Sequence, residues 1–196
     1  AYHNYNYLLM MQNLSDHLTY EEKKGKIRHR LWKVRTKKVI LATGSIERPM
    51  VFDCNDRPGI MLSSAVRKYL NYYGVKCGNE AVVFTNNDDA YETAISLHSK
   101  GVKIEAIVDI REESNGDLPK KCNELGIKIL WKSTITYTKG FKKLNQVHVM
   151  RLSKDKGSVI NKKIKINCDL LCISGGYTPT VHLFTQSGGK LTYNNE

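Results

Sequence analysis

The sequence predicts an α/β fold in which a Rossmann-like domain of three layers, a parallel sheet plus antiparallel strands, is inserted between two parts of a second α/β domain. A strand–helix–strand pattern at 81–109 favours the Rossmann-like domain. Apolar runs that end in small residues, at 38–44 and 168–176, stand on either side of it and are typical of strands buried in a parallel sheet. Strand patterns alone follow at 134–166 and predict the antiparallel part.

The composition is that of a folded protein. Of the 196 residues, 41% are hydrophobic and 26% are charged, so we expect compact domains with a true core. The five cysteines are scattered and contain no C-x-x-C pair, which suggests neither a disulfide framework nor a zinc site and argues against a thiol-disulfide reductase using this segment. No apolar run reaches the roughly 18 residues of a membrane span, and residues 1–5 carry no signal-peptide pattern. We therefore expect a soluble, cytoplasmic protein without a membrane partner.

The net charge of +12 leaves two interpretations open. Clustered Lys and Arg would favour a polyanionic partner such as nucleic acid. The lysines are instead spread along the chain, mostly as doublets at the expected strand ends and turns, for example Lys37 with Lys38 and Lys142 with Lys143. Solvated faces or an acidic partner subunit explain this pattern better, and we expect no nucleic-acid partner.

Residues 1–45 are predicted to form the first part of the interrupted domain. Strand-like stretches at 5–11 and 25–34, separated by polar segments, predict a small antiparallel meander. The run 38–44 predicts a strand that is buried on both faces.

Residues 46–78 are predicted to be a linker, because prolines and glycines mark turns along them. The linker contains one predicted helix, from Ser63 to Tyr73. Ser63 or Ser64 is the expected N-cap of this helix, and Gly74 is its expected stop.

Residues 79–166 are predicted to be the inserted domain. Strands at 81–85 and 102–109 flank a helix at 89–100, which is the pattern of a right-handed crossover between parallel strands. The other expected elements are a helix at 118–125 and strands at 127–131, 134–138, 146–152 and 159–166. Residues 167–196 are expected to return to the first domain through another buried apolar strand.

The carboxyl ends of the two apolar strands are candidate cofactor contacts, since ligands of open parallel sheets bind there. One strand ends in Ala42-Thr43-Gly44 and the other in Gly175-Gly176. Small residues are needed at such ends because a dinucleotide approaches the backbone closely. We therefore predict these five residues as cofactor-binding residues. The alternative is that the glycines only form turns.

The turn of the predicted crossover lacks the glycines of a phosphate loop. A nicotinamide-binding fingerprint reads G-x-G-x-x-G there, with an acidic residue near the end of the second strand. Asp109 supplies the acid, but the turn, Thr85 to Ala90, places Asp88 and Asp89 where a pyrophosphate would lie. Because these carboxylates would repel phosphate, we predict that the unit does not bind a dinucleotide in the usual way. Asp88 and Asp89 are interpreted as helix-capping and helix-dipole charges.

No catalytic or metal-ligating set follows from the spacing of the polar residues. The six histidines lie in different segments and are interpreted as surface or packed residues. Asp53, Asp56 and Arg57 form either a polar site or a salt-bridged linker, and the linker is favoured. We therefore predict no catalytic residue and no metal site in this chain.

The order of the elements resembles flavoproteins with two dinucleotide-binding domains, which are related to the pyridine nucleotide-disulfide oxidoreductases. The inserted Rossmann-like domain would then interrupt an incomplete FAD/NAD-type domain. A closer resemblance is to the alpha subunits of heterotetrameric sarcosine oxidases. It rests on four blocks: Val39–Pro49, Asn55–Leu62, Ala81–Asp88 with Ala90-Tyr91, and Ser174–Pro179 with Val181–Phe184. The family's first G-x-G-x-x-G loop and its folate-type domain are missing from these residues, so the resemblance implies an internal fragment that is inactive by itself.

The resemblance implies part of an amine-oxidising complex that converts sarcosine, O₂ and tetrahydrofolate to glycine, methylene-tetrahydrofolate and hydrogen peroxide. It implies NAD in the alpha subunit, FAD and FMN elsewhere in the parent complex, and the beta and other subunits as partners. The five small residues at the strand ends would then lie near the NAD. Two alternatives stay open: a degenerate nucleotide fold at 79–166 that serves only subunit assembly, and a subunit of a related amine or opine oxidase.

Overall fold

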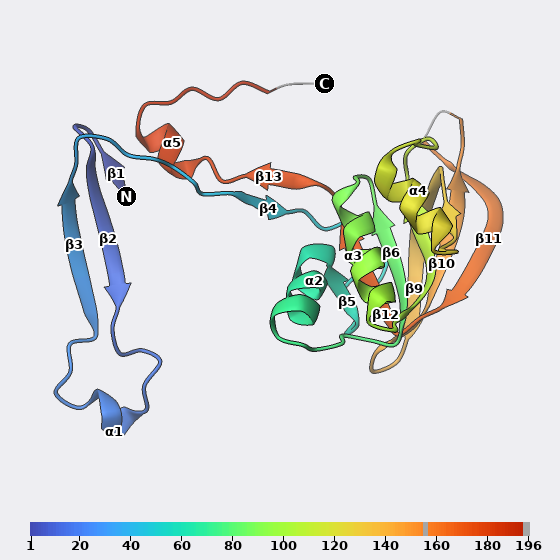
Figure 1. The fold of residues 1–196 in the computed structure, drawn as a ribbon, viewed down its shortest axis with the longest axis horizontal. Coiled ribbons are helices and arrows are strands. Elements are labelled where there is room, and N and C mark those ends of the chain that lie inside the picture. The colour runs from blue at the N-terminus through green and yellow to red at the C-terminus, as the bar shows by residue number, and fades with distance from the viewer. Residues whose placement is uncertain (155–156, 194–196) are drawn as a thin grey trace. The chain divides into compact units, whose positions relative to one another are not determined.

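The protein is described by a computed structural model, which covers residues 1–154 and 157–193 and, of residue 161, the backbone alone. The chain divides into two compact units (Figure 1). One unit comprises residues 1–46 and 179–196, and the other comprises residues 47–178. Each unit has its own secondary structure.

A parallel sheet forms the centre of the unit 47–178. Its strands lie in the order β5-β12-β6-β7-β8, and every neighbouring pair is parallel. The strands are β5 (Ile60–Leu62), β6 (Glu80–Thr85), β7 (Lys103–Asp109), β8 (Ile129–Leu130) and β12 (Leu170–Ser174). All of β12 is buried, and so is β6 after its first residue. This is the pattern of central strands that are covered on both faces.

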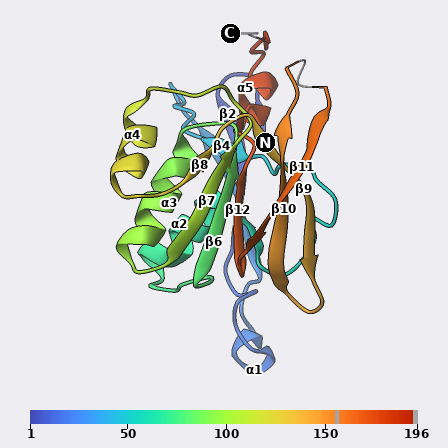
Figure 2. The same ribbon diagram turned by 90° about the vertical axis from the view of Figure 1, so that its right-hand side faces the viewer.

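Helices cover one face of this sheet (Figure 2): α2 (Ser63–Tyr72), α3 (Asp89–Ser99) and α4 (Asp117–Glu124). Because α3 joins β6 to the parallel strand β7, the predicted crossover is confirmed. Tyr91 and Leu97 of α3 and Val66 of α2 are fully buried in one core with Val83 and Ile107 of the sheet. At 11 residues, α3 is the longest helix of the described chain. None of the helices described has the length and apolar character that a membrane span requires.

An antiparallel sheet covers the other face of the parallel sheet (Figure 2). Its strands are β9 (Ser133–Gly140), β10 (Leu144–Leu152) and β11 (Val159–Asn167), in the order β11-β10-β9. Ile135, Val147 and Val149 form a second core with Phe84 and Leu171 of the parallel sheet. The three layers confirm the predicted fold class.

The other unit contains the predicted antiparallel meander. β1 (Tyr2–His3) pairs with β2 (Tyr7–Asn13), and β2 pairs with β3 (His29–Arg35). The short helices of this unit are α1 (Tyr20–Lys23) and α5 (His182–Gln186). β4 (Ser45–Glu47) and β13 (Tyr177–Pro179) form a two-stranded sheet. The chain passes from one unit to the other within these two strands.

Residues 38–44 differ from the prediction, because the structure gives them no strand. Ile40 is 92% exposed, and Ala42, Thr43 and Gly44 are exposed as well. An apolar run is buried on both faces only where neighbouring strands and covering layers are present, and the strands β1 to β3 of this unit pair with one another. The run is therefore an exposed connection.

Residues 46–78 and 167–178 also lie differently from the predicted linker and return segment. β5 and α2 belong to the layers of the unit 47–178, and β12 is a central strand of its sheet. The apolar run of β12 fits between β5 and β6, where both faces are covered, and α2 buries Val66 and Leu70 in the same core. An apolar run shows that a strand is buried, but it does not show which sheet the strand joins.

The start of α2 is capped by the buried carboxylate of Glu47, and not by the predicted Ser63 or Ser64. The N-cap position is Leu62, and Ser63 and Ser64 are already helical. Glu47 Oε2 accepts the backbone N–H of Ser64 at 2.9 Å and the hydroxyl of Ser64 at 2.6 Å. The predicted stop is confirmed, since Gly74 follows the last turn with φ of +67°.

Candidate functional site

The candidate site lies at the carboxyl ends of β6 and β12, within the unit 47–178. β6 leads through α3 to its neighbour β7, whereas its other neighbour, β12, comes from the C-terminal part of the unit. The strand order therefore reverses between β6 and β12. In open α/β sheets, ligands bind in the crevice at such a point.

Hydrogen bonds close the turn after β6 across this crevice. Thr85 Oγ1 accepts the N–H of Asn87 at 3.0 Å and donates to the carbonyl of Asn87 at 2.9 Å. The side-chain Nδ2 of Asn87 donates to Ser174 Oγ at 3.0 Å and to the Ser174 carbonyl at 3.3 Å. Asn87 therefore joins the ends of β6 and β12 at the place where a Rossmann fold leaves room for a pyrophosphate.

The carboxylate of Asp109, at the end of β7, is fully buried and satisfied within the protein. Its Oδ1 accepts the backbone N–H of Arg111 at 2.9 Å and the Nε–H of Arg111 at 3.1 Å. Its Oδ2 accepts the hydroxyl of Tyr91 and Nη2 of Arg111, each at 2.8 Å. Burial, followed by the charge and hydrogen bond of Asp109, raises the pKa of Tyr91, so the phenol stays protonated. In Rossmann domains an acid here binds a ribose hydroxyl, but the acceptors of Asp109 are already used.

Arg111 and Arg67 neutralise the acidic turn before α3. Arg111 Nη2 also contacts Asp88 Oδ1 at 2.7 Å, and hydrogen bonds to Asp109 and then to Asp88 raise the pKa of Arg111. Arg67 of α2 donates through Nη2 to both carboxylate oxygens of Asp89, at 2.9 and 3.1 Å. Burial acts to lower the pKa of Arg67, but the hydrogen bond and charge of Asp89, with a neighbouring glutamate, raise it overall.

A tyrosine from the segment after β12 completes this arrangement. Tyr177 donates its hydroxyl to Asp89 Oδ2 at 2.5 Å, and burial followed by this hydrogen bond raises the pKa of Tyr177. The interpretation of Asp88 and Asp89 as helix-dipole charges is confirmed, since Asp88 is the N-cap residue of α3 and Asp89 lies in its first turn, but the interpretation as a side-chain cap needs correction. Asp88 occupies the N-cap position of α3, but its side chain makes no capping hydrogen bond. The carboxylate of Asp88 instead binds Arg111, and that of Asp89 binds Arg67.

The glycine pair after β12 accommodates the neighbouring chain at 48–50. The N–H of Gly175 donates to the Arg48 carbonyl at 2.7 Å, and the N–H of Arg48 donates to the Gly176 carbonyl at 2.8 Å. A Cβ on Gly175 would stand 2.9 Å from the Pro49 carbonyl oxygen, and Gly176 has φ of +84°. These contacts support the turn alternative for both glycines, and their role in cofactor binding stays a prediction.

The other predicted site residues, Ala42, Thr43 and Gly44, lie in the exposed connection of the other unit. Thr43 Oγ1 donates to the Thr180 carbonyl at 2.7 Å, and the N–H of Thr180 donates to the Gly44 carbonyl at 2.9 Å. Gly44 has φ of +66° and open space where a Cβ would stand. The structure thus places the five predicted residues in two different units, and binding of a cofactor by Ala42, Thr43 and Gly44 also stays a prediction.

Sequence reasoning missed the two arginines that close the crevice. Arg111 stands two residues after Asp109, so its position beside the predicted acid was a usable signal. Arg67 stands 22 residues before Asp89, and no local pattern links the two. Arg57, interpreted as part of a salt-bridged linker, instead donates through Nη1 to the carbonyl of Gly140.

The sequence is similar to curated alpha subunits of one bacterial oxidase. It is 37% identical over 190 residues to sarcosine oxidase subunit alpha of Corynebacterium sp. (strain P-1), which covers 96% of this chain and 19% of that protein. It is 35% identical over 188 residues to the subunit of Corynebacterium sp. (strain U-96), with the same two coverages. It is 36% identical over 167 residues to the subunit of Rhizobium meliloti (strain 1021), which covers 85% of this chain and 16% of that protein.

Solved structures show the same fold at low sequence identity. Thioredoxin reductase of T. acidophilum matches with a TM-score of 0.61 and 18% identity, over 84% of this chain and 53% of that one. A FAD-dependent pyridine nucleotide-disulphide oxidoreductase from Desulfovibrio vulgaris matches with a TM-score of 0.59 and 15% identity, over 83% and 41%. No protein-family model matches the sequence. Along almost its whole length the chain is therefore similar to sarcosine oxidase alpha subunits, and it spans 19% of the length of its Corynebacterium relatives.

Proposed function

We propose that residues 47–178 are a nucleotide-type domain without a dinucleotide of its own, within an alpha-type subunit of an amine-oxidising oxidoreductase. The activity is extended to this chain from the names of its relatives, which state the oxidation of sarcosine. The observation that carries the proposal for the domain is the occupation of its crevice by the protein's own charges, Asp109 with Arg111 and Asp89 with Arg67.

The energetics of Asp109 support this proposal. A ribose hydroxyl would have to displace Arg111 or Tyr91 from a carboxylate that is fully buried. Breaking a buried charged pair costs about 3 to 5 kcal/mol. A single hydrogen bond to a ligand returns roughly 0.5 to 1.5 kcal/mol, so the exchange is unfavourable.

The turn before α3 gives a second argument, which concerns phosphate. A helix N-terminus attracts anions, but Asp88 and Asp89 place two carboxylates in the position that a pyrophosphate would take. Arg111 and Arg67 neutralise these carboxylates, and the Nη2 group of each arginine is then engaged. In addition, Asn87 joins the two strand ends that a diphosphate would have to separate. We infer that this turn binds no diphosphate.

The NAD expected for the parent subunit would then contact the other unit. Ala42, Thr43 and Gly44 are exposed and small, which supports a close approach of a dinucleotide to their backbone. Nicotinamide and flavin cofactors supply the hydride and electron transfer in such oxidoreductases. In this proposal FAD and FMN belong to the parent complex, with its beta and other subunits.

In this proposal residues 47–178 serve the assembly of the alpha-type subunit with its partner subunits. The two well-packed cores of this unit and the fully satisfied Asp109 support a rigid structural domain. All five cysteines are free thiols, which supports the expected location in the cytoplasm.

Calorimetric titration of NAD tests the proposal, with the 196-residue chain compared with a longer alpha-type subunit that contains it. We expect saturable binding by the longer protein alone. In the longer protein Gly44→Ala should weaken NAD binding, and Asp88→Asn, the control in the crevice, should leave it unchanged. Saturable binding by the 196-residue chain that Asp88→Asn alters would contradict the proposal.

A further inference from the structure

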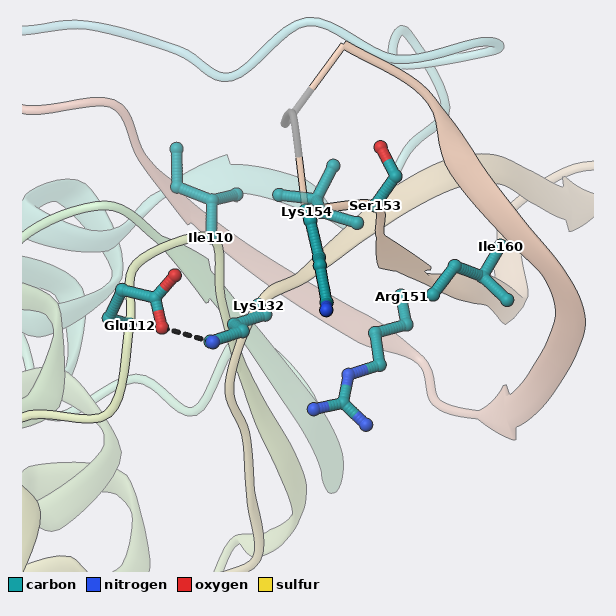
Figure 3. Close-up of a pocket in the computed structure, with 8 residues that line it drawn as sticks. Ile110, Glu112, Lys132, Arg151, Ser153, Lys154 and Ile160 are labelled. Carbon is teal, nitrogen blue, oxygen red and sulfur yellow. Dashed lines mark ion pairs between the residues drawn. The ribbon is translucent and has the colours of Figure 1, made fainter.

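A pocket of about 460 Å³ lies between the residues that follow β7 and the end of the antiparallel sheet (Figure 3). Its volume falls within the range of about 300 to 1,000 Å³ that small-molecule sites occupy. Ile110 lies on the side of β7, and Arg151, Leu152 and Ile160 lie on the side of β10 and β11. The pocket does not include the residues that close the crevice, so it is a separate site.

Three cationic side chains gather in this pocket. Figure 3 shows the side chains of Lys154 and Arg151 extending into the pocket, while the amino group of Lys132, at its edge, points toward Glu112. Glu112 pairs with Lys132, while the ion pairs found among residues 1–154 and 157–193 include neither Arg151 nor Lys154. With one carboxylate among three cations, the lining carries a net positive charge.

The backbone of Lys132 is held in an unusual conformation at the edge of this pocket. Its φ is +51°, a left-handed value that residues other than glycine rarely adopt. The N–H of Lys132 donates to the Arg111 carbonyl at 3.0 Å, and the Lys132 carbonyl accepts the N–H of Leu152 at 2.6 Å. These two bonds fix Lys132 between the loop after β7 and the end of β10. Strained residues that are fixed in this way gather at binding sites.

The surroundings of the pocket favour an anion that also has an apolar part. Ile110, Leu152 and Ile160 supply an apolar wall beside the cationic groups. The strands of the antiparallel sheet contain no Asp or Glu, and Lys139, Lys163 and other basic residues lie along them. A surface with charge of one sign raises the local concentration of ligands with the opposite charge.

We propose that this pocket binds a small organic anion, with a phosphate or carboxylate head and an apolar body. Arg151 presents the planar fork that holds such heads through two parallel hydrogen bonds. Lys154 and Lys132 add charge around the head, and the apolar body packs against Ile110 and Ile160. The site lies outside the crevice, so the inference does not depend on the absence of a dinucleotide there.

Titration of the ¹⁵N-labelled chain with phenyl phosphate and with benzoate tests the inference, with the amide signals of Ile110, Lys132 and Leu152 as reporters. We expect saturable shifts from at least one of the two, and the tighter ligand identifies the preferred head. Arg151→Gln and Lys154→Gln should each weaken that binding by roughly tenfold, since each removes a charged partner of the anion. Inorganic phosphate should bind more weakly than phenyl phosphate, because it has no apolar body.

Lys163→Gln is the matched control, because Lys163 is exposed on β11, outside the pocket, and carries the same charge. We expect this variant to weaken binding of the probes much less than Arg151→Gln or Lys154→Gln does. Equal weakening by Lys163→Gln would show attraction by diffuse charge and overturn the site. Absence of saturable shifts with both probes would overturn it as well. The side chains of Arg151, Lys154 and Lys163 are exposed, so the three variants should fold.

Discussion

Arg111 contacts Asp109 through both its backbone and its side chain: its N–H donates to Oδ1 at 2.9 Å, and its Nη2 donates to Oδ2 at 2.8 Å. The same guanidinium reaches Asp88 at 2.7 Å in the turn before α3. One side chain therefore satisfies the buried acid at the end of β7 and neutralises the turn after β6. These are the two places that a Rossmann domain offers to the ribose and the phosphates of a dinucleotide.

Arg111→Gln should destabilise the protein strongly, because it leaves the buried carboxylate of Asp109 without its cation. We expect the free energy of unfolding to fall by about 3 to 5 kcal/mol, measured by urea denaturation. Arg151→Gln removes the same charge from an exposed position and should change it by no more than about 0.5 kcal/mol. Equal stabilities of the two variants would show that the Asp109 contact contributes little.

Glu47→Ala should weaken the start of α2. The carboxylate of Glu47 is 5% exposed and accepts both the N–H and the hydroxyl of Ser64. Loss of a capping acceptor costs about 1 to 2 kcal/mol, because a backbone N–H of the first turn is left unsatisfied. Hydrogen exchange at the Ser64 amide should become faster in the variant. An unchanged exchange rate would mean that water replaces the carboxylate without cost.

Gly175→Ala should cost more stability than Gly126→Ala. A Cβ on Gly175 would stand 2.9 Å from a backbone carbonyl of Pro49, so the chain has to shift. Gly126 has φ of +72° but open space at the Cβ position, so its substitution carries only the left-handed strain of about 1 to 2 kcal/mol. Thermal unfolding of the two variants gives the comparison. A lower melting temperature for Gly126→Ala would show that the chain at 48–50 is free to move.

The buried thiols give a prediction on pH. Burial raises the pKa of Cys122 to about 11 and that of Cys168 to about 12, from an ordinary value of 9.0. A raised pKa in the folded state means that the neutral thiols add stability below pH 9, and that this contribution is lost as the pH rises through about 11 to 12. The urea midpoint should therefore fall as the pH rises from about 9 to about 12.

Alkylation by iodoacetamide gives an independent measurement of the same thiols. At pH 8 the native protein should react at Cys54, which is partly exposed, and not at Cys122 or Cys168, which are buried. All five cysteines should react once the protein is unfolded in urea. Equal labelling of Cys168 and Cys54 in the native protein, detected by mass spectrometry, would contradict the burial.

Much of the fold could be predicted from local patterns. The crossover, the helix that stops at Gly74 and the antiparallel strands follow from periodicity and turn residues, which act over short distances. The run at 38–44 was misjudged because burial depends on neighbouring strands, and Ile40 is exposed in this unit. The assignment of β12 failed for a related reason, since an apolar run does not name the sheet that it joins.

For the candidate site, the sequence could predict only that the turn after β6 does not bind a dinucleotide in the usual way. The missing glycines and the presence of Asp88 and Asp89 predicted a turn unsuited to a pyrophosphate. The contact of Arg67 with Asp89 could not be predicted, because α2 and α3 come together only through the packing of both helices on the sheet. Ion pairs between residues far apart in the sequence cannot be predicted from the spacing of neighbouring residues.

A titration of the ¹⁵N-labelled 196-residue chain with NAD tests whether the protein's own charges close the crevice between β6 and β12. The amide signals of residues 85–89 and 109–111 report on the turn and on the end of β7. We expect these signals to stay unchanged up to millimolar NAD. Saturable shifts at both groups of signals, with a single dissociation constant, would show instead that the crevice opens to a dinucleotide.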